Sequence, residues 1–186
     1  MYYTDTSVLI SYVFASDSGH GTSRKVLENI AIKYGQKLYA SSFTLVETCN
    51  TICRKIVKEG KWSLIDPLQK YVGIYENTEE RCRFLLSLII SFLKNRLGIE
   101  FVDEKGLYDF VLVGFNELRA PKVFKESIHL SHRLSLRIKD LLHLVYAFAL
   151  SKTHNIKYFL TRDIENFEKI RDTVKQLLQI EIILVK

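Results

Sequence analysis

The amino-acid sequence predicts an α/β fold, in which a central parallel sheet of about five short strands carries helices on both faces. Short β-prone segments alternate with longer segments of helical periodicity along the whole chain. The 186 residues are 47% hydrophobic and 26% charged, as in globular domains. Only 8 Gly and 2 Pro are present, too few for a turn-rich all-β fold or a flexible linker. We therefore expect one domain spanning residues 1–186.

The amino-terminal elements are predicted from caps, apolar periodicity and terminating glycines. Hydroxyl side chains precede the helical runs, and Gly35 and Gly60 follow two of them. In order, we expect a strand at 2–4, a helix from Ser7 or Val8, a helix over 22–34, a strand at 37–41 and a long helix from Ser42 to Gly60.

The remaining elements follow from the same signals, after a less regular stretch at 61–77. Glu79 and Glu80 suit the positive end of a helix, and Pro121 separates two further helices. In order, we expect a helix at 78–97, a strand at 99–102, helices at 107–118, 123–134 and 137–152, a strand at 157–160, short helices through Phe167 and Ile170 and near 173–178, and a strand at 180–185.

The ends of the chain and its cysteines suggest a reducing compartment. The amino-terminal segment has no basic region and Asp5 interrupts its apolar run, so a secretory signal is not expected. No apolar run is long enough to cross a membrane. Cys49, Cys53 and Cys82 are odd in number, which favours buried free thiols in a cytoplasmic protein. Cys49 and Cys53 would share a helix face, but no second Cys/His pair could complete a metal site with them.

Aspartates directly follow two of the predicted strands. Asp5 comes after the first strand and Asp163 after the fourth. Either one alone could be only a helix cap. Ligands of open α/β sheets bind beyond the carboxyl ends of the strands, so a pair of acids at equivalent positions indicates a functional site.

Two further carboxylates lie near the beginnings of predicted helices. Glu47 lies about one turn into a helix, where the dipole alone could favour it. Asp140 opens the most apolar helix, DLLHLVYAFAL, and its burial requires a partner, which could be Arg137, Lys139 or a divalent metal. Four converging carboxylates would suit a hard cation such as Mg²⁺ or Mn²⁺. The sequence contains no GxxxxGK[ST], GxGxxG or GxSxG motif.

These segments resemble the PIN-domain ribonucleases, and most closely the VapC toxins of type II toxin–antitoxin systems. The order of the acids and their placement on strand end, helix, helix and strand end agree with that family. The four segments that carry the resemblance are YYTDTSVLI, SSFTLVETCNTICRK, LRIKDLLHLVYAFAL and KYFLTRDIENF.

The resemblance implies a PIN-like fold and an Mg²⁺- or Mn²⁺-dependent endoribonuclease that leaves a 5′-phosphate and a 3′-hydroxyl. By resemblance, the metal ligands would be Asp5, Glu47, Asp140 and Asp163. Ser7 and Thr161 would supply supporting hydrogen bonds. The resemblance also implies an RNA substrate, a protein antitoxin and a homodimer, with the apolar stretch 84–93 as a candidate interface.

The chain also departs from the usual toxin. It is longer, and we place the extra length in a helical elaboration around 61–134. Asn166 stands where many relatives carry another acid. Two alternatives therefore stay open: a PIN nuclease of RNA processing, and a catalytically silent PIN module that binds RNA or protein.

The basic residues favour a polyanionic partner, since 27 Lys and Arg face 21 Asp and Glu. One basic run is Arg54, Lys55, Lys58 and Lys61, and the other is Arg133, Arg137 and Lys139. Both could be solvated helix faces, but the second lies beside Asp140 and is the better candidate for contacts with RNA phosphates. His143 follows on the same helix side and is expected to be structural, although a general acid or supporting role is an alternative. Trp62, Tyr71 and Tyr75 are expected to pack rather than stack on bases.

Overall fold

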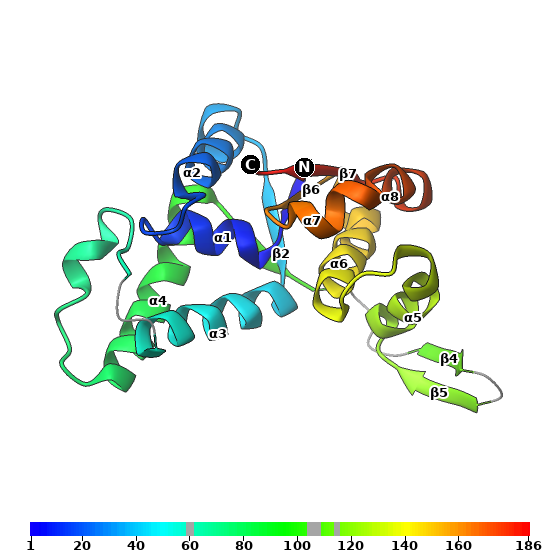
Figure 1. The fold of residues 1–186 in the computed structure, drawn as a ribbon, viewed down its shortest axis with the longest axis horizontal. Coiled ribbons are helices and arrows are strands. Elements are labelled where there is room, and N and C mark those ends of the chain that lie inside the picture. The colour runs from blue at the N-terminus through cyan, green and yellow to red at the C-terminus, as the bar shows by residue number, and fades with distance from the viewer. Residues whose placement is uncertain (59–61, 104–108, 114–115) are drawn as a thin grey trace.

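A five-stranded parallel sheet forms the centre of the computed structural model, which describes residues 1–58, 62–103, 109–113 and 116–186 (Figure 1). The strand order is β3-β2-β1-β6-β7, and each neighbouring pair is parallel. The strands are β1 (Tyr2–Thr4), β2 (Leu38–Ser41), β3 (Glu100–Val102), β6 (Tyr158–Thr161) and β7 (Glu181–Leu184). The predicted α/β class is confirmed.

The strand order reverses at β1. The chain proceeds from β1 to β2 and β3 on one side, and later places β6 and β7 on the other. Thr4 pairs with Leu160, and the backbone N–H of Asp5 donates to the Leu160 carbonyl at 3.1 Å. The residues that follow β1 and β6 therefore emerge side by side at the carboxyl edge, which is the usual ligand position in such sheets.

Helices cover both faces of the sheet, as predicted (Figure 1). One face carries α1 (Thr6–Val13), α2 (His20–Glu28) with a π-helical continuation (Asn29–Lys33), α3 (Ser42–Lys58) and α4 (Thr78–Leu97). The other carries α5 (Lys122–Leu134), α6 (Ile138–His154), α7 (Ile164–Phe167) and α8 (Arg171–Leu178). Short 3₁₀ turns lie at Leu68–Tyr71 and Glu168–Ile170.

Two hydrophobic clusters hold these layers together. Strand residues alternate between them: Leu38 and Ala40 belong to the cluster with α1 to α4, whereas Tyr39 belongs to the cluster with α6. The same alternation separates Leu160 from Phe159. This period of two is what a sheet buried on both faces requires, since successive side chains point to opposite sides.

The helix expected at 107–118 is a wrong prediction for the part of it that the structure describes. Strands β4 (Asp109–Val113) and β5 (Asn116–Ala120) form an antiparallel hairpin outside the main sheet, while 107–108 and 114–115 lie outside the described residues. Valines in alternation before a glycine favour a hairpin over a helix. The described residues of 61–134 therefore form strands as well as helices, and an ion pair of 2.8 Å between Asp109 and Lys125 joins β4 to α5.

The expectation of three free thiols is also wrong. Cys53 and Cys82 form a disulfide that joins α3 to α4, and Cys49 is the free cysteine. The two residues are 29 positions apart in sequence, but packing of α3 against α4 brings their Cα atoms to 5.6 Å. Linear spacing could not reveal this pairing, and it removes Cys53 from any metal site.

The apolar stretch 84–93 lies within α4, where Leu85, Ile89 and Leu93 are buried in the core. Trp62 packs edge-to-face on Phe14, and Tyr75 packs on Phe84, so these aromatic rings are packing residues, as expected. Within the described part of the chain, no helix combines the length and apolarity needed to cross a bilayer.

Candidate active site

Asp5 stands at the carboxyl end of β1 and also caps α1. Its side chain is only 5% exposed. Oδ1 accepts hydrogen bonds from the backbone N–H of Val8 at 3.2 Å and from the Ser7 hydroxyl at 2.6 Å. Burial raises the pKa of Asp5, although the charge of His143 and these hydrogen bonds oppose the rise. A buried carboxylate is thus held in place at the point where the strand order reverses.

Asp163 occupies the matching position after β6 and caps α7. Its Oδ1 accepts from the backbone N–H of Asn166 at 3.1 Å, and its own backbone N–H donates to the Thr161 hydroxyl at 3.0 Å. The side-chain amide of Asn166 donates to Asp163 Oδ2 at 2.6 Å and to Asp140 Oδ2 at 3.4 Å. Asn166 therefore bridges two of the predicted ligands.

Asp140 is the third carboxylate of this cluster, in the first turn of α6. It is only 6% exposed. Its pKa is raised by burial first and then by the negative charges of Asp163 and Asp5, with Lys139 and His143 opposing. Three acids from β1, α6 and the β6–α7 connection are thus close enough to repel one another.

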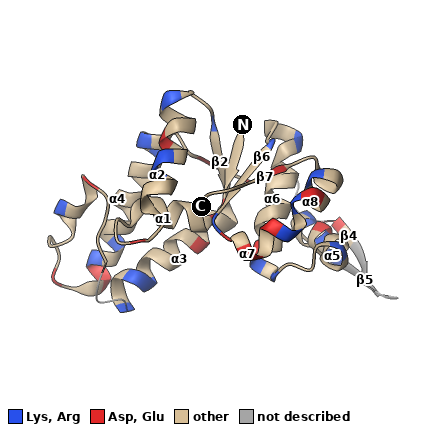
Figure 2. Cartoon of the chain, turned by 45° about the horizontal axis from the view of Figure 1, so that its top comes forward, with Lys and Arg blue, Asp and Glu red and all other residues tan. Residues whose placement is uncertain are grey.

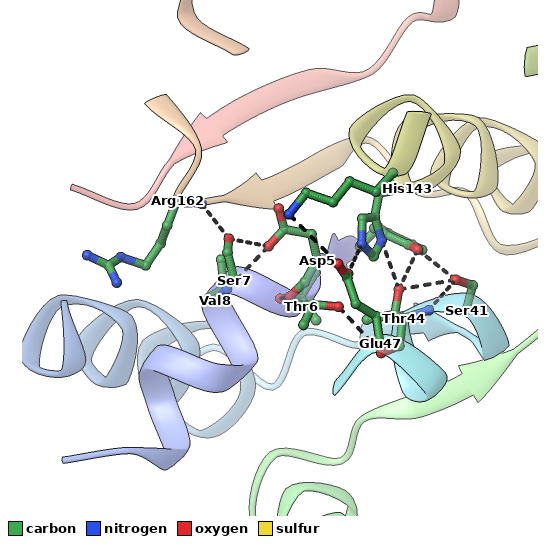
Figure 3. Close-up of polar contacts among 12 residues, drawn as sticks. Asp5, Thr6, Ser7, Val8, Ser41, Thr44, Glu47, His143 and Arg162 are labelled. Atoms are coloured by element: carbon green, nitrogen blue, oxygen red, sulfur yellow. Dashed lines mark hydrogen bonds and ion pairs between the residues drawn. The ribbon is translucent and has the colours of Figure 1, made fainter. Parts of the chain in front are cut away.

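Glu47 is the fourth predicted ligand and comes from α3 (Figure 3). Its Oε2 lies 2.6 Å from His143 Nε2, and Lys139 Nζ lies 3.9 Å from Oε1. Burial raises the pKa of Glu47, but hydrogen bonds from His143 and Thr6 and the charges of His143 and Lys139 bring it down to about 2. Glu47 is therefore ionised over the whole physiological pH range.

His143 links this carboxylate to a buried hydroxyl network. Nδ1 lies 3.2 Å from Thr44 Oγ1, which in turn lies 2.7 Å from the Tyr3 hydroxyl and 3.1 Å from Ser41 Oγ (Figure 3). The histidine is 3% exposed. Both ring nitrogens therefore have partners, as expected of a structural histidine, and one of these partners is a predicted metal ligand.

The four predicted carboxylates line a single cleft of about 610 Å³, together with Ser7 and His143. In Figure 2 acidic segments of α3 and of the α7 region lie near the middle of the molecule. Thr161 is fully buried beneath the cleft.

Both predicted basic runs contribute residues to the lining of the cleft, not only the run beside Asp140. Lys139 lines the cleft, whereas Arg133 and Arg137 are exposed outside its lining. Arg54, from the run rated as the weaker candidate, also lines the cleft, and Lys61 of that run lies outside the described residues. The sequence could not rank the two runs, because the ranking depends on which helix face meets the cleft.

Asp17 and Arg162 line the same cleft, and sequence reasoning missed both. Arg162 Nη1 lies 2.6 Å from Asp17 Oδ1. Arg162 stands between the two residues singled out at the end of β6, which is a signal that could have been used. Asp17 lies in a connection and has no pattern to mark it.

The donor set fits a hard divalent cation. Across the described residues, no three His, Cys, Asp or Glu side chains are already gathered as a metal-binding group. Glu47 is hydrogen-bonded to His143, and Asp163 to Asn166. However, the acids supply only oxygen donors. The pKa of Asp5 is raised by burial, and that of Asp140 by burial and by the charges of Asp163 and Asp5, a cost that a bound cation would reverse.

Comparisons with known proteins bear on the fold. Residues 2–87 match the sequence model of the PIN domain, a range that contains Asp5 and Glu47 but not Asp140 or Asp163. No curated protein matches the chain significantly. The fold is similar to that of a chain in the crystal structure of VapBC2 from Rickettsia felis bound to a DNA fragment from their promoter. That similarity has a TM-score of 0.52 at 16% identity and covers 100% of this chain and 98% of the other.

Proposed function

We propose that the chain, whose residues 2–87 match the sequence model of the PIN domain, is a metal-dependent endoribonuclease that hydrolyses phosphodiester bonds of RNA. PIN domains are generally nucleases and typically use divalent metal ions. One observation carries the proposal: Asp5, Asp140 and Asp163 converge with Glu47 on one cleft at the reversal of strand order. A purely structural role would not explain two buried and two half-buried acids at the ligand edge of the sheet.

The residues that would hold Mg²⁺ or Mn²⁺ are Asp5, Glu47, Asp140 and Asp163. When bound at such a site, a divalent ion polarises the phosphodiester and lowers the pKa of coordinated water. We place this chemistry at the carboxyl edge between β1 and β6.

The supporting residues fix the carboxylates before substrate arrives. Ser7 donates to Asp5 Oδ1, and Thr161 accepts from the backbone of Asp163, so each anchors an acid that follows a strand. His143 holds Glu47, and Asn166 holds Asp140 and Asp163 together. Such contacts restrict the carboxylate rotamers, which reduces the entropy lost when a metal binds. Arg54 and Lys139 line the same cleft and would supply positive charge for RNA.

The central test compares wild type with Asp140→Asn on total RNA in Mg²⁺, Mn²⁺ or chelator. We expect wild type to cleave with either ion and to stop in chelator, and Asp140→Asn to lose at least about 100-fold of the rate, because a ligand is lost. Asp172→Asn is the matched control, since Asp172 is exposed on α8 outside the cleft. Equal cleavage by wild type and Asp140→Asn would contradict the mechanism.

We further propose that the nuclease is the toxin of a toxin–antitoxin pair, with a small protein antitoxin as its partner. The support is the VapC-like set of acids and the similarity of the fold to a chain of VapBC2. Expression of wild type, but not of Asp140→Asn, should arrest bacterial growth, and the product of an adjacent small gene should co-purify and inhibit cleavage. RNA cleavage without growth arrest would instead favour an RNA-processing nuclease. Tight Mn²⁺ binding without cleavage would favour a silent binding module.

A further inference from the structure

The side chain of Arg162 lies in the candidate cleft on the opposite side of Ser7 from Glu47 and His143 (Figure 3). The backbone N–H of Arg162 donates to Ser7 Oγ at 3.0 Å, and that hydroxyl donates to Asp5 Oδ1 at 2.6 Å. Two hydrogen bonds therefore connect Arg162 to a predicted metal ligand. Its position relative to the acids is set by the end of β6 rather than by a flexible loop.

One edge of the guanidinium is firmly anchored. Nη1 donates to Asp17 Oδ1 at 2.6 Å and to the Ser11 hydroxyl at 3.0 Å. Asp17 Oδ1 is itself held by the Ser11 hydroxyl at 2.8 Å and by the backbone N–H of Gly19 at 2.9 Å. These contacts come from α1 and the connection to α2, so they immobilise the planar group against the protein.

The guanidinium also has a donor without a partner. Among the residues that the structure describes, Nε is buried without a hydrogen-bond partner. The side chain is still 25% exposed and lines the cleft. An unpaired donor on a buried charged group is costly, and its retention beside a site suggests a ligand.

Gly19 makes this arrangement possible. A Cβ atom built on Gly19 would overlap the guanidinium carbon and nitrogens of Arg162. The absence of a side chain at position 19 therefore allows Arg162 to lie flat against the backbone. A substitution there must push the guanidinium out of its present position.

We propose that Arg162 binds an RNA phosphate next to the scissile one, and that Asp17 and Gly19 are positioning residues for it. The inference rests on the proposed nuclease function. Lys139 lies beside Glu47, with Nζ 3.9 Å from Oε1, and Arg162 lies on the other side of Ser7, so positive charge flanks the acids on two sides (Figure 3). A polyanionic strand that crosses five cleft acids, including Asp17, needs such flanking cations. A guanidinium anchored through Nη1 holds its positive charge at a fixed place in the cleft, where it can pair with a phosphate.

The test measures binding of a fluorescein-labelled single-stranded RNA as a function of salt, in chelator and in the Asp140→Asn background, so that the RNA stays intact. Each phosphate contact on a single strand contributes about 0.7 to the slope of log K against log salt. Arg162→Gln should lower the slope by about that amount and weaken binding about tenfold at low salt. Gly19→Ala should behave alike, and Arg162→Lys should keep most of the slope because it keeps the charge.

Arg83→Gln is the matched control, because Arg83 is also paired with an acid, Glu79, but lies exposed on α4 away from the cleft. For Arg83→Gln, the slope of log K against log salt should equal that of the Asp140→Asn protein without a further substitution. A slope for Arg162→Gln equal to that of Arg83→Gln would overturn the proposal, and if Arg162→Gln lowers only the melting temperature, the Asp17 pair is purely structural. RNA cleavage by the wild-type protein is measured in parallel. Cleavage by wild type together with an unchanged salt slope for Arg162→Gln would contradict the role of Arg162 alone, whereas absence of cleavage would contradict the nuclease function.

Discussion

Asp140 shows how a proposed metal ligand can weaken the fold that holds it. Its burial and the charges of Asp163 and Asp5 raise its pKa, so the ionised form is less favourable in the folded chain than in the unfolded one. For an acid with a raised folded-state pKa, stability is lost as pH rises above the unfolded-state value. In the metal-free protein this acid therefore acts against folding at neutral pH.

Replacing the charge should consequently stabilise the metal-free protein. We expect Asp140→Asn to raise the melting temperature in chelator at neutral pH by about 2–4 °C, the usual shift for about 1 kcal/mol in a chain of this size. Mg²⁺ should raise the melting temperature of wild type and have little effect on the variant, because binding to the native state alone stabilises it. Differential scanning fluorimetry measures both, with Asp172→Asn as control. A lower melting temperature for Asp140→Asn in chelator would contradict the repulsion argument.

The ionised form of Glu47 has the opposite effect on stability from that of Asp140. Its pKa is lowered to about 2 from an ordinary 4.5, so it contributes stability above pH 4.5 that is lost as pH falls towards 2. We expect Glu47→Gln to lose stability at neutral pH and to show a flatter acid limb between these values than wild type. Thermal melts in chelator across that pH range test this. Parallel acid limbs for the two proteins would show that the contact with His143 does not stabilise the ionised form.

At the scale of elements, α3 connects three features. It carries Glu47 and Arg54 in the cleft, and Cys53 fastens it to α4 through the disulfide with Cys82. The loop that this bond closes contains the irregular stretch after α3. The bond therefore limits the unfolded ensemble and helps to keep the Glu47-bearing helix against the core.

Removing this bond should destabilise the chain. For a loop of 29 residues, chain entropy predicts a loss of about 3–4 kcal/mol in the free energy of unfolding. Denaturant unfolding of Cys82→Ala under non-reducing conditions measures the loss. Cys49→Ala is the control, because Cys49 is the free cysteine on the same helix. If both variants unfold at the wild-type midpoint, the disulfide does not form in solution.

The hairpin of β4 and β5 shows where local patterns are insufficient. The segment around 107–118 contains enough apolar residues for a helical period, but the Val-Leu-Val run also fits a strand. Antiparallel pairing with β5 and contact with α5 decide between the two. By contrast, α4 was predicted with its observed bounds, since Asn77 caps it through Glu79 and Glu80 and Gly98 ends it.

At the scale of the whole molecule, the site is assembled from both halves of the chain. The PIN-domain match covers residues 2–87, whereas Asp140 and Asp163 come from segments beyond it. Insertion of β6 beside β1 joins the two halves, because that pairing places their carboxyl ends at one edge. A chain truncated before β6 would lose Asp163, and one truncated before α6 would lose Asp140 as well.

We also expect the whole molecule to be a homodimer. The resemblance to toxins of this type supports the expectation, and so do the exposed apolar residues Val46 and Val57 on α3. Light scattering coupled to size exclusion at micromolar concentration should give the mass of two chains. The mass of one chain would contradict the expectation without affecting the proposed chemistry.

The sequence alone determined what depends on short-range order. Strand and helix periods, caps and glycines placed most elements, and acids directly after β1 and β6 marked the ligand edge of the sheet. The two-layer covering of a parallel sheet followed from the alternation of the elements. These features are local because they arise from backbone preferences and from the repeat of apolar residues over a few positions.

Only the tertiary structure decided which distant residues meet. His143 contacts Glu47 across 96 positions, Arg162 contacts Asp17 across 145, and Asn166 bridges Asp163 to Asp140 across 26. The disulfide between Cys53 and Cys82 likewise depends on tertiary packing, and so does the presence of Arg54 rather than Arg133 in the lining of the cleft. Such contacts depend on strand order and on helix rotation about the sheet, which follow from packing of the entire core and leave no periodic signature in the chain.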